Sequence, residues 1–189
     1  MTDRYNLHKI GNKPITSKEL ERLGIPRTAI QTLTKEEKLL RIGRGVYQLP
    51  SVELDNESLY RAATKRINGQ SAVCLMSALS HYNLTDEIPK QTWLLVNIDS
   101  RSTHKDIRLY RSNNPHWKIG IVKADGYKIT SLERTIVDAI ILKKRFGTLG
   151  IQALKKALRE KLTTASKIMD MATKFGADER VLPYLEALT

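Results

Sequence analysis

Residues 24–50 read GIPRTAIQTLTKEEKLLRIGRGVYQLP, and this stretch decides the fold of the first part of the chain. Proline is well tolerated at the first position of a helix, and Ala29, Ile30 and Leu33 recur at the spacing of one helix face. We therefore predict a helix from Pro26 to about Lys38, with these three side chains facing inward.

A shorter helix is predicted just before it, in residues 15–23, which read ITSKELERL. Thr16 or Ser17 can cap its beginning, and Gly24 ends it. Two helices joined by a sharp turn are typical of a helix-turn-helix, in which the second helix enters the major groove of DNA.

A hairpin follows the second helix. Residues 39–42 and 46–49 are rich in strand-forming side chains, and Gly43-Arg44-Gly45 supplies the turn between them. The first part of the chain is thus predicted to be a winged helix-turn-helix, with this hairpin as its wing.

The open side of the 26–38 helix carries side chains of types that bind DNA. Arginine can bond bidentately to guanine and glutamine to adenine, whereas threonine and lysine suit phosphates. An arginine between two glycines at a hairpin tip can approach a duplex closely. The predicted DNA contacts are Arg27, Thr28, Gln31, Thr34, Lys35, Arg41 and Arg44, with Arg27, Thr28 and Gln31 ranked first on the helix and Arg44 on the wing. An ordinary solvated helix face and a plain turn are the alternatives.

The charge balance favours a polyanionic partner. The chain has 189 residues, with 32 Lys and Arg against 20 Asp and Glu, for a net charge of +12. The basic excess is largest at the two ends: residues 1–50 carry 10 basic and 5 acidic side chains, 51–125 carry 10 and 8, and 126–189 carry 12 and 7. Solvated lysines that keep a protein soluble would give a similar total.

The remainder of the chain predicts a second domain. Residues 50–55 are polar and contain proline, which indicates a linker, and we place the boundary between a winged-helix domain, 1–52, and an α+β domain, 53–189. In the second domain we predict helices at 56–68 and 71–82, the latter capped by Ser71, then strands at 92–98, 107–111, 117–123 and 127–129, with a hairpin turn at Asp125-Gly126. After Ser131 everything reads as helical, with caps at Thr130 or Ser131, at Thr148 and at Thr163 or Thr164, and stops at Gly147 and Gly176. The predicted fold class is α+β, with a small antiparallel or mixed sheet and a helical C-terminal tail.

The sequence gives no sign of export or of metal chemistry. It opens without an apolar signal segment and has no run of about 20 apolar residues, so we expect a cytoplasmic protein. The single cysteine, Cys74, lies in the apolar run AVCLMSAL and is expected to be a buried packing residue. The four histidines, among them His81 on an amphipathic helix, lack metal-ligand spacing, and no phosphate-binding loop or nucleophile elbow occurs. We expect no cofactor, no metal and no enzymatic activity.

Two further groups of charged residues admit two interpretations each. Arg134 and Asp138 stand at i, i+4 and can form a structural ion pair, and Glu133 can close a capping box. The alternative makes Glu133 and Asp138 the metal ligands of a nuclease, although they diverge by about 140° around the helix. A basic cluster of seven residues is either a second polyanion surface or a solvated helix exterior: Lys143, Lys144, Arg145, Lys155, Lys156, Arg159 and Lys161.

Three stretches, 24–50, SAVCLMSALSHYNLTDEIP at 71–89 and DGYKITSLERTIVDAI at 125–140, resemble the AbiEi antitoxins of type IV toxin-antitoxin systems. The resemblance covers about residues 14 to 142. It implies a winged helix that represses the protein's own operon at an inverted-repeat operator, joined to a domain that counters a nucleotidyltransferase-like toxin. It also points to the 26–38 helix and Arg44 for DNA. The chain is short for an antitoxin, which leaves open a stand-alone regulator or a protein-interaction module built on a winged helix.

Overall fold

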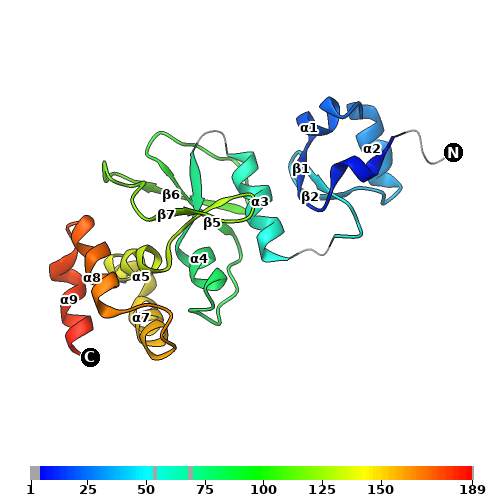
Figure 1. Ribbon diagram of the computed structural model, residues 1–189. Coiled ribbons are helices and arrows are strands. Elements are labelled where there is room, and N and C mark those ends of the chain that lie inside the picture. The colour runs from blue at the N-terminus through cyan, green and yellow to red at the C-terminus, as the bar shows by residue number, and fades with distance from the viewer. Residues whose placement is uncertain (1–4, 53–54, 68–69, 189) are drawn as a thin grey trace. The chain divides into compact units, whose positions relative to one another are not determined.

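The computed structural model describes residues 5–52, 55–67 and 70–188. The chain packs as two compact units, Met1–Gly69 and Gln70–Thr189 (Figure 1). The helix that follows the predicted linker therefore belongs to the first unit by its contacts. The predicted domain boundary falls beside residues 53 and 54, and the predicted helix end at Asn68 is also outside the described residues; the boundary stays a prediction.

The first unit is a winged helix-turn-helix. Its elements are the 3-10 helix η1 (Leu7–Ile10), β1 (Ile15–Thr16), α1 (Ser17–Arg22), α2 (Arg27–Lys35), β2 (Leu40–Gly43), β3 (Val46–Gln48) and α3 (Asn56–Arg66). The strands form an antiparallel sheet in the order β1-β3-β2, in which β2 and β3 are the wing. A small apolar core holds the helices on the sheet, and it consists of Ile10, Ile15, Leu20, Ile25, Ile30, Leu33 and Leu39.

The two helices of the helix-turn-helix differ in how their ends are set. Thr16 caps α1 with a full capping box: its hydroxyl accepts from the Glu19 backbone N–H, and the Glu19 side chain accepts from the Thr16 N–H at 2.7 Å. Helix α2 ends at Lys35, three residues before the predicted end. There Glu37 takes a left-handed φ of 56°, and the backbone N–H groups of Lys38 and Leu39 both donate to the Leu33 carbonyl. This closing turn buries Leu39 completely and directs the chain into β2.

The second unit is a mixed five-stranded sheet with helices, so its α+β class is confirmed. It contains β4 (Ser71–Val73), α4 (Leu75–His81), β5 (Thr92–Asn97), β6 (Ile107–Ser112), β7 (Ile121–Lys123), β8 (Lys128–Thr130), α5 (Leu132–Ile141), α6 (Lys143–Phe146), α7 (Leu149–Arg159), α8 (Ala165–Lys174) and α9 (Asp178–Glu186). The strand order is β6-β5-β4-β8-β7. Strand β4 pairs antiparallel with β5 and parallel with β8, and β7 and β8 form an antiparallel hairpin.

The predicted helix at 71–82 is wrong in its first part. Ser71–Val73 is the central strand of the sheet, and Ser71 is not a cap; the helix begins at Leu75, after Cys74. All three residues of β4 are buried, because a central strand is covered on both faces and reads as a continuous apolar run without alternation. Cys74 is buried as predicted.

The predicted strand at 117–123 is also too long. Only Ile121–Lys123 is a strand, because Gly120 at φ 72° turns the chain immediately before it. The Asp125-Gly126 hairpin is confirmed: Gly126 has a φ of 80°, and the Ala124 N–H donates to the Tyr127 carbonyl at 2.9 Å. Lys123 and Lys128 consequently stand directly opposite each other.

The end of the chain is helical from Leu132 onward, as predicted. Ser131 and Thr164 cap α5 and α8 with their hydroxyls, whereas Thr148 precedes α7 without a side-chain cap bond. Gly150 lets α7 approach α5 closely, since a Cβ there would lie 2.7 Å from the backbone of Ala139. The core of the unit gathers side chains of α4, α5, α7, α8 and α9 with those of β5.

Candidate nucleic-acid interface

Helix α2 presents one buried face and one exposed face. Ile30 and Leu33 are buried in the core of the first unit. Arg27, Gln31 and Lys35, each four residues after the last, follow one another along the exposed side. The helix therefore offers a line of one arginine, one glutamine and one lysine, the order of side chains that can read bases near the N-terminus of the helix and hold a phosphate near its end.

Two threonines of α2 differ in their surroundings. Thr28 is exposed beside Arg27, on the flank of the line. Thr34 is half-buried at the edge of the buried face, and its hydroxyl donates to the Ile30 carbonyl at 2.7 Å. Thr34 is thus the predicted contact whose hydroxyl hydrogen is already committed within the helix. Thr32, which we did not predict, is exposed one turn after Thr28 on the same flank, and its hydroxyl donates to the Thr28 carbonyl.

The Arg27 guanidinium is exposed but has an acidic partner. Its Nε lies 2.7 Å from a carboxylate oxygen of Glu21 on α1, and the Arg27 side chain is 73% exposed. An ion pair this open to solvent contributes little to stability and can exchange for another anion. Sequence reasoning missed Glu21, although its position one turn before Gly24 places it beside the start of α2.

The wing tip is tied to the beginning of α1. The turn between β2 and β3 consists of Arg44 and Gly45, and Gly45 has a φ of 72°, which suits glycine. The Gly45 carbonyl accepts from the Ser17 backbone N–H at 3.0 Å and from the Ser17 hydroxyl at 3.4 Å. These bonds hold the turn in place while the Arg44 side chain stays exposed; Arg41 on β2 is also exposed.

A second tie joins α3 to α1. Lys65 donates to the Pro14 carbonyl at 2.8 Å and contacts the Glu19 carboxylate at 3.1 Å. Burial acts to raise the pKa of Glu19, but hydrogen bonds from Thr16 and the charge of Lys65 outweigh it and lower that pKa overall. The acidic side chain that ends the capping box is therefore kept ionised, and α3 supports the helix-turn-helix.

Glu133 and Asp138 have different hydrogen-bond partners. Asp138 accepts from Arg134 Nε at 2.8 Å in a buried pair, and the Arg134 guanidinium also donates to the carbonyls of Trp117 and Ile119. Glu133 instead accepts from the hydroxyls of Ser131 and Thr163.

The predicted capping box with Glu133 is wrong, because Ser131 is the cap and Arg134, not Glu133, holds the third helical position. Among the described residues there is no group of three His, Cys, Asp or Glu that could hold a metal ion.

The basic cluster lies on α6 and α7 and the turn after α7. Lys143, Lys144, Arg145, Lys155, Arg159 and Lys161 are exposed, and Lys156 is half-buried. Part of this charge is engaged locally: Lys143 donates to the Tyr184 hydroxyl, and the Arg145 guanidinium lies 5.7 Å from the Trp93 ring centroid.

None of the helices in the described part of the chain combines the length and the hydrophobicity that a membrane-spanning helix requires.

The first unit has a helix-turn-helix, a wing and the exposed line of Arg27, Gln31 and Lys35. These features define it as a domain of the class found in DNA-binding regulators. Residues 6–50 match the family model described as "Transcriptional regulator, AbiEi antitoxin", which confirms the resemblance for this part of the chain. Among solved structures, the chain is similar to the RV2827C protein from Mycobacterium tuberculosis, with a TM-score of 0.60 and 13% identity over 97% of this chain and 79% of that protein. At this identity the likeness concerns the fold alone. No curated protein matches the chain significantly.

Proposed function

We propose that this protein is a sequence-specific DNA-binding transcriptional repressor that acts in the cytoplasm. The observation that carries the proposal is the exposed line of Arg27, Gln31 and Lys35 on α2, opposite the buried Ile30 and Leu33. Helix α2 enters the major groove, Arg27 and Gln31 meet base edges, and Lys35 meets a phosphate. Thr28 is proposed to donate to a DNA phosphate beside them, and Thr34 to do the same once its hydroxyl leaves the Ile30 carbonyl.

The wing supplies the second contact. Arg44 lies at a turn that the bonds to Ser17 hold in place, and Arg41 lies on the strand that leads to it. Because the turn is already held, its backbone needs no ordering when Arg44 binds, which favours contact with a phosphate or with a narrow minor groove. No reaction is part of this proposal.

The test is fluorescence-anisotropy binding to the DNA upstream of the protein's own gene, against a scrambled duplex, over a range of salt. The double variant Arg27→Ala with Arg44→Ala should weaken binding to the upstream DNA by about 2 to 5 kcal/mol, since a good base contact contributes roughly 1 to 3. It should also flatten the salt dependence.

The matched control removes two exposed lysines of α8, Lys167→Ala with Lys174→Ala. This variant loses the same charge but should bind within about twofold of the unmodified protein. Equal affinities for both duplexes, or equal losses in the two variants, would refute sequence reading by the winged helix.

We further propose that the repressor is an autoregulating antitoxin that counters a nucleotidyltransferase-like toxin and binds an inverted repeat. The match of residues 6–50 to the AbiEi regulator family supports this. Expression of a neighbouring nucleotidyltransferase-like gene should stop growth, and co-expression of this chain should restore it. If the variant Arg27→Ala with Arg44→Ala also restores growth, the chain counters the toxin by a route other than repression. If growth stays arrested with the unmodified chain, the protein is a stand-alone regulator and not an antitoxin.

A further inference from the structure

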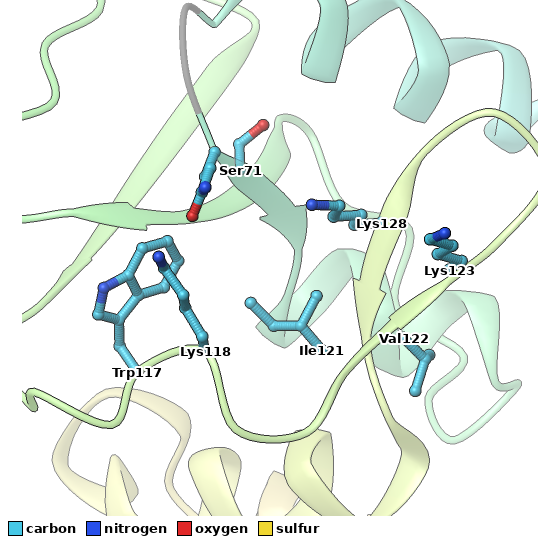
Figure 2. Close-up of a pocket in the computed structure, with 8 residues that line it drawn as sticks. Ser71, Trp117, Lys118, Ile121, Val122, Lys123 and Lys128 are labelled. Atoms are coloured by element: carbon cyan, nitrogen blue, oxygen red, sulfur yellow. The ribbon is translucent and has the colours of Figure 1, made fainter.

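A hollow of about 270 Å³ lies on the second unit around the β7-β8 hairpin. Its apolar lining comes from Trp117, Ile121 and Val122, and its charged lining from Lys118, Lys123 and Lys128. In Figure 2, Ile121 lies between Trp117 and Lys118 on one side and the two hairpin lysines on the other. Among the described residues that line the hollow, none is acidic.

The three lysines have no acidic partner in the part of the chain that the structure describes. Within the described ranges, none of them forms an ion pair, and the ammonium of Lys118 lies 5.6 Å from the centroid of the Trp117 ring. Lys123 and Lys128 are also direct cross-strand partners. Like charges in this position repel and cost stability, so the hairpin carries a repulsion that a bound anion would relieve.

Protection of the sheet edge does not account for this arrangement. Strand β7 is an edge strand, and a lysine there discourages pairing with another chain. Lys128, however, lies on β8, which is paired on both sides, by β4 and β7. Protection of the edge strand requires only Lys123, whereas an anion site uses Lys118, Lys123 and Lys128 together.

We propose that this hollow binds a small organic anion with a flat apolar body, such as an aromatic carboxylate or an aryl phosphate. The body packs against Trp117 and Ile121, and the anionic group lies among the lysines. Ligand sites typically combine an apolar lining with a few convergent polar groups, and the volume here suits a ligand of one or two rings. None of the lining residues belongs to α2 or the wing, so the proposal is tested without DNA and does not depend on the DNA-binding proposal.

The probe is 8-anilinonaphthalene-1-sulfonate, an aromatic anion whose own fluorescence reports binding. It is titrated into the full chain, into Lys123→Glu with Lys128→Glu, and into the control Lys144→Glu with Lys155→Glu. The control reverses the charge at two exposed lysines outside the hollow, and it changes the net charge by the same amount as the pocket variant does. We expect the pocket variant to bind the probe about tenfold more weakly and the control to bind within about twofold of the unmodified chain. Circular dichroism of each variant shows whether it is folded.

A second measurement places the probe at Trp117. The chain has two tryptophans, Trp93 and Trp117, so in a Trp93→Phe variant all tryptophan emission comes from the hollow. Saturable quenching of that emission by the probe, reversed by phenyl phosphate at a lower concentration than by inorganic phosphate or phenol, is the expected result. Equal losses in both charge variants would overturn the proposal. Displacement by an oligonucleotide or a glutamate-rich peptide but not by phenyl phosphate would also overturn it, and would make this surface a contact for a macromolecule.

Discussion

Replacing Asp138 with asparagine tests the electrostatics of the buried ion pair in the second unit. The Asp138 side chain is 6% exposed, and its one hydrogen bond within the described residues comes from Arg134 Nε. Burial raises the pKa of this carboxyl from its ordinary value of 3.8 to about 6, although Arg134 favours the charged form. Asparagine keeps the shape and an acceptor oxygen for Arg134 but cannot titrate.

The size of the effect follows from the two pKa values. The unfolded chain releases this proton near pH 3.8, whereas the folded chain keeps it up to about pH 6. At 1.36 kcal/mol per pKa unit, protonated Asp138 contributes about 3 kcal/mol of stability below pH 3.8, and this is lost as the pH rises through 6. The lowered pKa values of Glu19 and Asp55 have the opposite sign, but they are common to both proteins and cancel in the difference.

The assay is urea unfolding between pH 4 and pH 7, followed by tryptophan emission, because both tryptophans lie in the second unit. The free energy of unfolding of Asp138→Asn, relative to that of the unmodified protein, should increase with pH by up to about 3 kcal/mol. The reasoning is refuted if the unmodified protein instead gains stability over the variant as the pH rises. Arg134 would then hold the carboxylate ionised at every pH, and burial would be the weaker effect.

Two more changes test the first unit's interface and the second unit's packing. Glu21→Ala frees Arg27 from an exposed ion pair of 2.7 Å and removes a negative charge, so affinity for the upstream DNA in the anisotropy assay should rise about two- to fivefold; a lower affinity would show that Glu21 positions Arg27. Gly150→Ala places a Cβ 2.7 Å from the Ala139 backbone and should cost about 1 to 3 kcal/mol in urea unfolding, because α5 and α7 must separate; an unchanged midpoint would mean that this contact can relax.

Much of the winged helix was predictable, because most of its helix ends and turns carry a local sequence signal. A capping threonine, a proline at the start of α2 and a glycine-rich turn are chain-local features that occur in the structure, although Pro26 is the N-cap of α2 and not its first residue as predicted. The end of α2 was misplaced because nothing in residues 36–38 is unsuited to a helix; burial of Leu39 under the core decides where the helix stops. Tertiary packing set that end, and no local pattern encodes it.

The central strand and the hollow show what pattern reasoning leaves out. Ser71–Val73 joined the predicted helix because a three-residue strand buried on both faces has no alternation to detect. The hollow could have been found in part, since Lys123 and Lys128 flank a predicted Asp-Gly turn and must face each other across the hairpin. Trp117 lines the same hollow because the chain turns at Gly120, and the predicted strand over residues 117–123 did not include that turn.

The net charge of +12 points to an anionic partner but does not locate it, so the surroundings of individual cations have to be compared. Arg61, Lys65 and Arg134 have carboxylate partners and hold elements together, whereas Arg44 in the first unit and Lys123 and Lys128 in the second have none among the described residues. Other exposed cations in the described part of the chain also lack such a partner, but Arg44 and the two hairpin lysines differ in what surrounds them. Arg44 stands on an exposed turn without an apolar lining, which suits a long backbone of phosphates, while the lysines border an aromatic hollow, which suits one small anion. The salt dependence of binding should therefore distinguish the two sites. The affinity for DNA at the wing should fall steeply with ionic strength because many counterions are released, and the affinity for a small anion in the hollow should fall only slightly.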